Sequence, residues 1–139
     1  MSGDHSLRME HEITIRVRYA ETDRQRILYH AHYLTYFEVA RTEMLRAAGV
    51  RYRDLEAAGC FLVVTEASCR YRSPAGYDDE LRIATRVTDV SPVRIVFRYG
   101  VTQAEGGRVV AEGETTLACV DGSGRPRRLP PELSQRLGA

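Results

Sequence analysis

The sequence predicts an α+β domain in which one long helix packs on a curved antiparallel sheet of five or so strands. One strand pattern comes before the single long amphipathic segment, and four long strand patterns with short turns between them come after it. Strands joined by short turns pair antiparallel, and a chain of 139 residues is one domain by its length. Because one long helix must cover the whole sheet, the sheet is expected to wrap around that central helix.

The first strand is expected to begin at Glu12, because apolar residues at positions 13, 15, 17 and 19 alternate with polar ones. A polar loop, residues 21–26, follows it. The helix is expected to begin near His30 and to end at Gly49. Its apolar residues recur at spacings of three and four, and they are Tyr33, Phe37, Ala40, Met44, Ala47 and Ala48.

After the helix, residues 50–59 predict one or two helical turns closed by Gly59. Four strands are expected at 61–72, 81–90, 93–103 and 109–120, each rich in β-branched or aromatic residues. Pro130 and Pro131 predict a short terminal helix, since proline is accepted in a first turn. We expect residues 1–11 to form a disordered tail and residues 12–139 to form a single domain.

Composition excludes several classes of function. The formal net charge is +1, so no strong field attracts nucleic acid. All 20 basic residues are arginine, which rules out a catalytic lysine. The three cysteines are odd in number and widely spaced, so neither a disulfide framework nor a paired-thiolate zinc site is indicated. There is no apolar run of membrane-spanning length and no signal-peptide core, so we expect a cytoplasmic protein.

Several segments together resemble one enzyme family. They are YAETD at 19–23, LYHAHYL at 28–34, YFE at 36–38, ARTE at 40–43, YRSPA at 71–75, DDEL at 78–81 and RPRRLPPEL at 125–133. This string resembles the 4-hydroxybenzoyl-CoA thioesterase family of the hotdog fold. The resemblance implies a long central helix wrapped by a curved antiparallel sheet, and hydrolysis of an acyl or aroyl thioester of coenzyme A or acyl carrier protein. It also implies a homodimer with its active site at the interface, and further pairing into a homotetramer. No cofactor is expected.

Asp23 lies in the polar loop before the helix. Thioester hydrolysis needs a nucleophile or a base that activates water, and a carboxylate can serve as either. The alternative is a capping or turn aspartate, but Asp23 precedes His30 by seven residues, too far for a first-turn cap. The resemblance implies that Asp23 is the catalytic residue.

The start of the helix is the second candidate element. Backbone N–H groups there are free, and the helix dipole is positive at that end, which suits an oxyanion. The resemblance implies an oxyanion site at the backbone N–H of His30. The His30 side chain either positions Asp23 or water, or packs at the helix start. Tyr29 is expected to line the acyl pocket or to pack at the helix entry.

Arg26 departs from the family pattern, in which glycine commonly stands three residues after the catalytic aspartate. Glycine permits a positive φ, and arginine does so much less readily. We therefore expect Arg26 to alter the acyl pocket or to contact an anionic group of the substrate.

Two other polar features have structural interpretations. His30 and His32 resemble a zinc pair, but no third ligand lies nearby in the sequence, so no metal site is expected. Arg41 falls at the border of the apolar stripe, where an unpaired charge is costly. We expect Arg41 to form an ion pair with Glu38 or Glu66.

Two functions compete with a thioesterase. Hotdog hydratases carry their catalytic acid four or five residues before histidine, whereas the spacing between Asp23 and His30 is seven. A non-catalytic module that binds acyl thioesters remains the other alternative.

Overall fold

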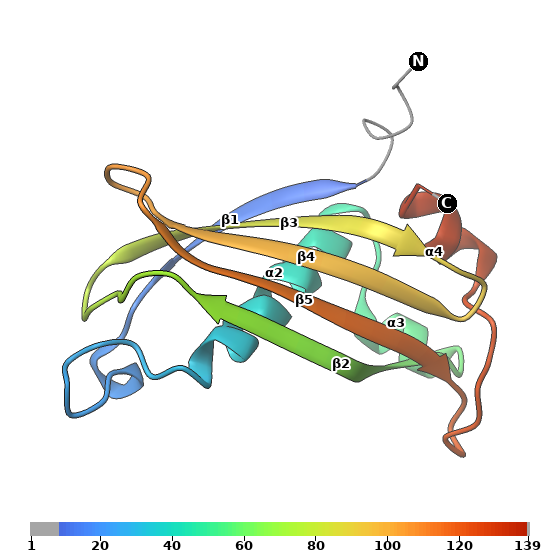
Figure 1. The fold of residues 1–139 in the computed structure, drawn as a ribbon. Coiled ribbons are helices and arrows are strands. Elements are labelled where there is room, and N and C mark those ends of the chain that lie inside the picture. The colour runs from blue at the N-terminus through green and yellow to red at the C-terminus, as the bar shows by residue number, and fades with distance from the viewer. Residues whose placement is uncertain (1–8, 139) are drawn as a thin grey trace.

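The computed structural model describes residues 9–138, which form one sheet crossed by one long helix (Figure 1). The elements in chain order are β1 (Glu10–Arg16), the 3₁₀ turn η1 (Tyr19–Glu21), α2 (His32–Ala47), α3 (Tyr52–Ala57), β2 (Phe61–Tyr71), β3 (Glu80–Val90), β4 (Arg94–Gln103), β5 (Val109–Val120) and α4 (Pro131–Arg136).

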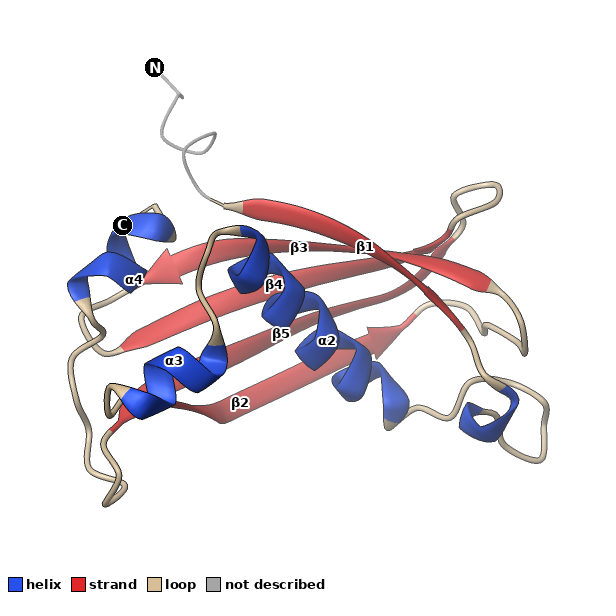
Figure 2. Cartoon of the chain, turned by 180° about the vertical axis from the view of Figure 1, so that it is seen from behind, coloured by secondary structure: helices blue, strands red, loops and turns tan. Residues whose placement is uncertain are grey.

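The five strands form one antiparallel sheet in the order β1-β3-β4-β5-β2. Helices α2 and α3 lie on the same face of this sheet, as Figure 2 shows. The predicted α+β class, with one long helix against a five-stranded antiparallel sheet, is confirmed.

The core lies between α2 and the two central strands. Side chains of β3 and β4 alternate between buried and accessible positions, as expected for a sheet covered on one face. On α2, Phe37 and Met44 are fully buried. The Phe37 ring stacks on that of Tyr99 from β4, with centroids 4.2 Å apart and planes at 9°. This contact joins the middle of the helix to the middle of the sheet.

The end of α2 has the backbone conformation that a glycine at position 49 predicts. Gly49 has a φ of 85°, which only glycine adopts readily. The Val50 amide donates to the Leu45 carbonyl at 2.8 Å, and the Gly49 amide donates to Arg46 at 2.9 Å. These bonds engage carbonyls that the helix itself leaves free, so the predicted stop at Gly49 is confirmed.

The first strand is displaced from its predicted bounds. It begins at Glu10 rather than Glu12, because Glu10 and His11 pair with Arg86 and Thr85 of β3. It ends at Arg16, opposite Glu80, where β3 begins. Residues 1–8 of the predicted tail lie outside the described residues, whereas its last two residues belong to β1.

Strand β2 forms one edge of the sheet and is accessible along most of its length. Residues 63–68 are all exposed, among them Val64 at 48%. Such an edge offers unpaired backbone groups to another strand.

Two strand glycines provide a matched test of the packing. A Cβ added at Gly113 would overlap the Phe37 ring and lie 2.9 Å from the Ser68 carbonyl, whereas a Cβ at Gly100 meets nothing within 4 Å. We expect Gly113→Ala to lower the free energy of unfolding by about 1–3 kcal/mol through overpacking. Gly100→Ala should leave it unchanged or raise it by up to about 1 kcal/mol. Urea denaturation of both variants measures the difference, and equal stabilities would contradict this account of the core.

Candidate active site

The loop that carries Asp23 is a small hairpin closed by backbone hydrogen bonds. The Tyr29 amide donates to the Glu21 carbonyl at 2.9 Å, and the Asp23 amide donates to the Ile27 carbonyl at 2.9 Å. An isolated antiparallel bridge joins Thr22 and Leu28 between these two bonds. Asp23 is therefore held beside the segment that enters α2, although it lies seven residues before His30.

The tip of this hairpin turns at Arg26, whose φ is 67°. The Arg26 amide donates to the Asp23 carbonyl at 2.9 Å, which closes the turn. On the far side, the Leu28 amide donates to the Ala75 carbonyl at 2.8 Å, and Ile27 forms a bridge with Gly76. Arginine thus adopts here the left-handed conformation for which glycine is usually selected.

Asp23 is half-buried, and only part of its hydrogen-bonding capacity is used. Its Oδ1 accepts the Gln25 amide at 2.8 Å, a local turn contact of the kind that the alternative interpretation predicted. Asp23 Oδ2 accepts no hydrogen bond within residues 9–138. The carboxylate is therefore fixed through one oxygen and keeps the other available.

The start of α2 is uncapped. Its N-cap residue is Ala31, and no side chain of the described residues caps the helix. The His32 amide donates to the Tyr29 carbonyl at 3.0 Å, but the amides of His30 and Ala31 donate to no carbonyl within residues 9–138. Two N–H groups are thus free beside the Asp23 hairpin, at the positive end of the helix dipole.

Aromatic rings surround this uncapped end. The Tyr29 ring, 43% exposed, lies 4.4 Å from the exposed His30 ring. From β2, the Tyr71 hydroxyl donates to the His30 carbonyl at 3.1 Å. Tyr71 also packs edge-on against Tyr33 at 5.3 Å, and burial raises the pKa of Tyr33 to about 12. The uncapped end is therefore bordered mainly by tyrosine rings.

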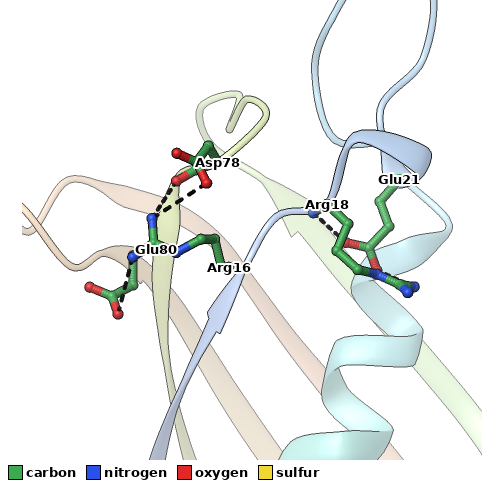
Figure 3. A network of polar contacts seen from close by, with 5 residues as sticks. All are labelled: Arg16, Arg18, Glu21, Asp78 and Glu80. Atoms are coloured by element: carbon green, nitrogen blue, oxygen red, sulfur yellow. Dashed lines mark hydrogen bonds and ion pairs between the residues drawn. The ribbon is translucent and has the colours of Figure 1, made fainter.

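A buried carboxylate, which the sequence analysis did not single out, connects these parts. Glu21 is 6% exposed and accepts the Tyr36 hydroxyl of α2 at 2.7 Å and the Arg18 amide at 2.9 Å. Figure 3 shows Arg18 and Glu21 facing each other, with Arg16 directed toward Asp78 and Glu80. A signal was available, because a tyrosine on a buried helix face needs a partner for its hydroxyl.

The hydrogen bonds to Glu21 stabilise its charged form. Burial alone would raise the pKa of Glu21, but the bonds from the Arg18 amide, the Tyr36 hydroxyl and the Arg18 guanidinium lower it below its ordinary value. The Tyr36 hydroxyl is correspondingly harder to ionise, because burial and the hydrogen bond to Glu21 raise its pKa. Glu21 is therefore an ionised anchor between η1 and α2.

The predicted site residues lie close together along the chain, but they do not all contact one another. Asp23, Arg26, Tyr29 and His30 all lie on the hairpin and on the segment that follows it into α2. The side chains of Asp23 and His30 share no hydrogen bond in the described part of the chain. His30 presents its carbonyl to Tyr71 and its ring to Tyr29.

The ion pair predicted for Arg41 is wrong. Neither Glu38 nor Glu66 lies within 4 Å of its guanidinium, and both glutamates are exposed. Arg41 instead lies beside the hydroxyls of Tyr99 and Tyr52, because its position on α2 faces the sheet.

Two features are absent from residues 9–138. Three or more histidine, cysteine, aspartate or glutamate side chains do not come together there in a way that could hold a metal ion. None of the helices in this part of the chain combines the length and apolarity needed to cross a membrane.

Comparison with known proteins gives the class that this fold and site define. The model of the thioesterase-like superfamily matches residues 5–137. The acyl-CoA thioester hydrolase YbgC of Escherichia coli is 36% identical over 120 residues, which is 86% of this chain and 89% of that protein.

Solved structures agree with that class. The DHNA-CoA thioesterase of Staphylococcus aureus superposes with a TM-score of 0.87 at 31% identity, covering 91% of this chain and 87% of that one. A 4-hydroxybenzoyl CoA thioesterase superposes with a TM-score of 0.85 at 17% identity over 93% of this chain and 99% of that one, which shows the shared fold. The chain belongs to the thioesterase-like superfamily and is, as the sequence predicted, a thioester hydrolase with a hotdog fold.

The backbone at Arg26 gives a stability prediction. A non-glycine residue in the left-handed region costs about 1–2 kcal/mol, and glycine removes that cost while adding about 0.5–1 kcal/mol of unfolded-state entropy. Arg26→Gly should therefore raise the free energy of unfolding by about 0.5–1 kcal/mol. Arg24→Gly is the control, because Arg24 has no positive φ and should only lose stability. Denaturant titration distinguishes them, and a destabilised Arg26→Gly variant would count against this reading of the turn.

The anchoring role of Glu21 predicts a pH dependence. Its folded-state pKa lies below the ordinary value of 4.5, so its stabilising contribution is full above that value and is lost as the pH falls through the folded-state pKa. Glu21→Gln should cost about 1–3 kcal/mol at pH 7, as expected for lost hydrogen bonds to a charged group. The variant should also show a shallower loss of stability on acidification than the wild type. Thermal unfolding from neutral to acidic pH measures both, and parallel curves would refute the assignment.

Proposed function

We propose that the chain hydrolyses an acyl or aroyl thioester of coenzyme A or of acyl carrier protein, with Asp23 as nucleophile or general base. The observation that carries this proposal is a carboxylate with one unbonded oxygen close in the chain to an uncapped helix start. The carboxylate lies on the small hairpin, and the free amides lie on the segment that follows it. The relatives support a coenzyme A thioester, because the names of YbgC and of the Staphylococcus aureus enzyme specify acyl-CoA and DHNA-CoA.

In the proposed reaction, the thioester carbonyl oxygen accepts hydrogen bonds from the free amides of His30 and Ala31. Attack at the carbonyl carbon drives negative charge onto that oxygen, where preorganised N–H donors are most effective. The attacking group is either an Asp23 oxygen, which forms a mixed anhydride that water then hydrolyses, or a water that Asp23 deprotonates. In both cases the carbon–sulfur bond breaks and the carrier leaves as a thiolate, which takes a proton from Asp23 in the general-base route or from water in the nucleophilic route.

Two neighbouring residues are proposed to contact the substrate. The Tyr29 ring is partly exposed beside the free amides and would line the entrance to the acyl pocket. Arg26 lies at the exposed tip of the hairpin, where its guanidinium would meet a phosphate of coenzyme A or an acidic carrier protein. The His30 side chain, exposed at the same end of α2, would position water or Asp23.

We further propose that the active site is completed in a homodimer joined along β2. The exposed edge of β2 carries the apolar residues Val63 and Val64 and ends at Tyr71, which contacts His30. Pairing two copies of β2 would give hydrogen-bond partners to the unpaired backbone groups of both edge strands. It would also bring the second chain close to the helix start.

The sheet face opposite α2 supports further pairing into a tetramer. It contains a hollow of about 1060 Å³ whose lining includes four arginines and four glutamates, namely Arg70, Arg72, Arg86, Arg98, Glu10, Glu12, Glu112 and Glu114. Interspersed charges in equal number favour a second copy of the same surface over a strongly charged partner. Light scattering during size-exclusion chromatography distinguishes two chains from four.

Asp23→Asn tests the proposed chemistry, because it keeps the shape of the side chain while removing its basicity and nucleophilicity. We expect thiol release from acyl-CoA to fall by about 10²–10⁴-fold, with the oligomeric mass and the melting temperature unchanged. Asp89→Asn is the matched control, since Asp89 is an exposed carboxylate on β3, and it should retain full turnover. A thiol-trapping dye measures turnover on a panel of short-chain, aromatic and polyketide-derived thioesters.

Three results would contradict this proposal and favour another role for Asp23 or for the chain. Full activity in Asp23→Asn removes Asp23 from the chemistry. Tight binding of thioesters without turnover on any panel member favours the non-catalytic module. Hydration or dehydration of an enoyl or hydroxyacyl thioester without thiol release favours a hydratase. The same panel applied to Arg26→Gly tests substrate recognition, because an unchanged acyl profile removes Arg26 from it.

A further inference from the structure

Arg41 is a buried charge that the proposed chemistry does not use. It lies midway along α2 and is 7% exposed. Its polar neighbours are the hydroxyls of Tyr52 from α3 and Tyr99 from β4. Figure 2 shows α3 and α2 on the same face of the sheet. Because its neighbours Tyr52 and Tyr99 come from α3 and β4, the Arg41 guanidinium lies between these elements.

No carboxylate of the described part of the chain pairs directly with this guanidinium. No aspartate or glutamate oxygen of residues 9–138 lies within 4 Å of Arg41. Burial raises the pKa of the Tyr52 and Tyr99 hydroxyls, so both remain neutral at physiological pH. Arginine does not deprotonate in proteins, and an uncompensated buried ion costs several kcal/mol.

Unused hydrogen-bond donors gather at the same place. The Nε–H of Arg41 and the hydroxyls of Tyr52 and Thr85 are buried without a partner among the described residues. Thr85 stands directly opposite Tyr99 in the β3–β4 register, and Arg41 and Tyr52 are also neighbours of Tyr99. Three donors and one positive charge, with no carboxylate oxygen within 4 Å of the guanidinium, are the complement of an anion rather than of a cation.

The surroundings limit the size of such an anion and give it a route. The donors project from packed elements of the core, so an anion bound among them must be small. Tyr52 also lines a hollow of about 410 Å³ at the end of α2, together with Arg46, Arg51 and Arg53. These arginines make the approach to Tyr52 positive, which raises the local concentration of anions.

We propose that Arg41, with the hydroxyls of Tyr52 and Thr85, binds a small monovalent anion such as chloride between α2, α3 and β4. The ion neutralises the buried guanidinium and accepts the three unused donors. Its role is structural, because half the length of α2 separates it from the free amides at the helix start.

The test compares the melting temperature in sodium chloride with that in sodium gluconate at equal sodium concentration, since gluconate is too large for the site. Above the dissociation constant, each tenfold rise in chloride should raise the melting temperature of the wild type by about 4 °C. Arg41→Met should abolish the difference between the two salts. Arg51→Met is the matched control, because it removes an exposed arginine of the nearby hollow and should keep the difference. If Arg41→Met fails to fold, Tyr52→Phe removes one donor and should reduce the chloride effect.

Crystals grown in sodium bromide give the direct measurement. An anomalous bromide peak within hydrogen-bonding distance of Arg41 Nε is expected in the wild type. Coincident chloride and gluconate curves overturn the proposal, as does bromide absent from Arg41. Chloride stabilisation that persists in Arg41→Met also overturns it, because the ion then binds elsewhere. Thioesterase activity is not needed for any of these readouts, so they are independent of the role of Asp23.

Discussion

The geometry of the candidate active site depends on one buried carboxylate. The side chain of Glu21 accepts the Tyr36 hydroxyl from α2 and the Arg18 amide at the exit of β1, while its carbonyl accepts the Tyr29 amide. A single residue thus connects the strand, the hairpin and the helix. Ionisation of Glu21 is favoured by these bonds in spite of its burial. Any candidate catalytic group between residues 22 and 31 takes its position from this connection.

The segment held by Glu21 has two features that lower its stability. Its turn places arginine at a φ of 67°, and its helix begins at an alanine N-cap with two amides unused. A serine or aspartate cap would stabilise the helix by about 1 kcal/mol, but its side chain would occupy the donors that an oxyanion needs. Local departures of this kind are expected at functional sites, and here the rest of the hairpin is hydrogen-bonded well enough to hold them in place.

Sequence patterns predicted the helices and strands and the glycine that follows the end of α2. Strand β5 has the predicted bounds, and α2 ends two residues before Gly49, because β-branched strand residues and a left-handed glycine are local signals. The end of β1 was misplaced because it depends on where β3 begins, 64 residues later. Glu21 was not singled out, since its partner Tyr36 is recognised only when the loop folds back onto the helix. The partner of Arg41 was mispredicted because helical spacing favours nearby acids, whereas the fold turns that side chain toward tyrosines.

The two buried charges, Glu21 before α2 and Arg41 midway along it, are balanced in different ways. At the start, the charge of Glu21 is balanced by donors of the chain itself, so the hairpin geometry needs no added ligand. Midway, Arg41 has no acidic partner in residues 9–138 and faces neutral hydroxyls. Strong anchoring of the middle of α2 against β4, through Phe37 on Tyr99, keeps the helix fixed there. The uncapped first turn can then remain open to substrate, because its position is set by contacts further along the helix rather than by a cap.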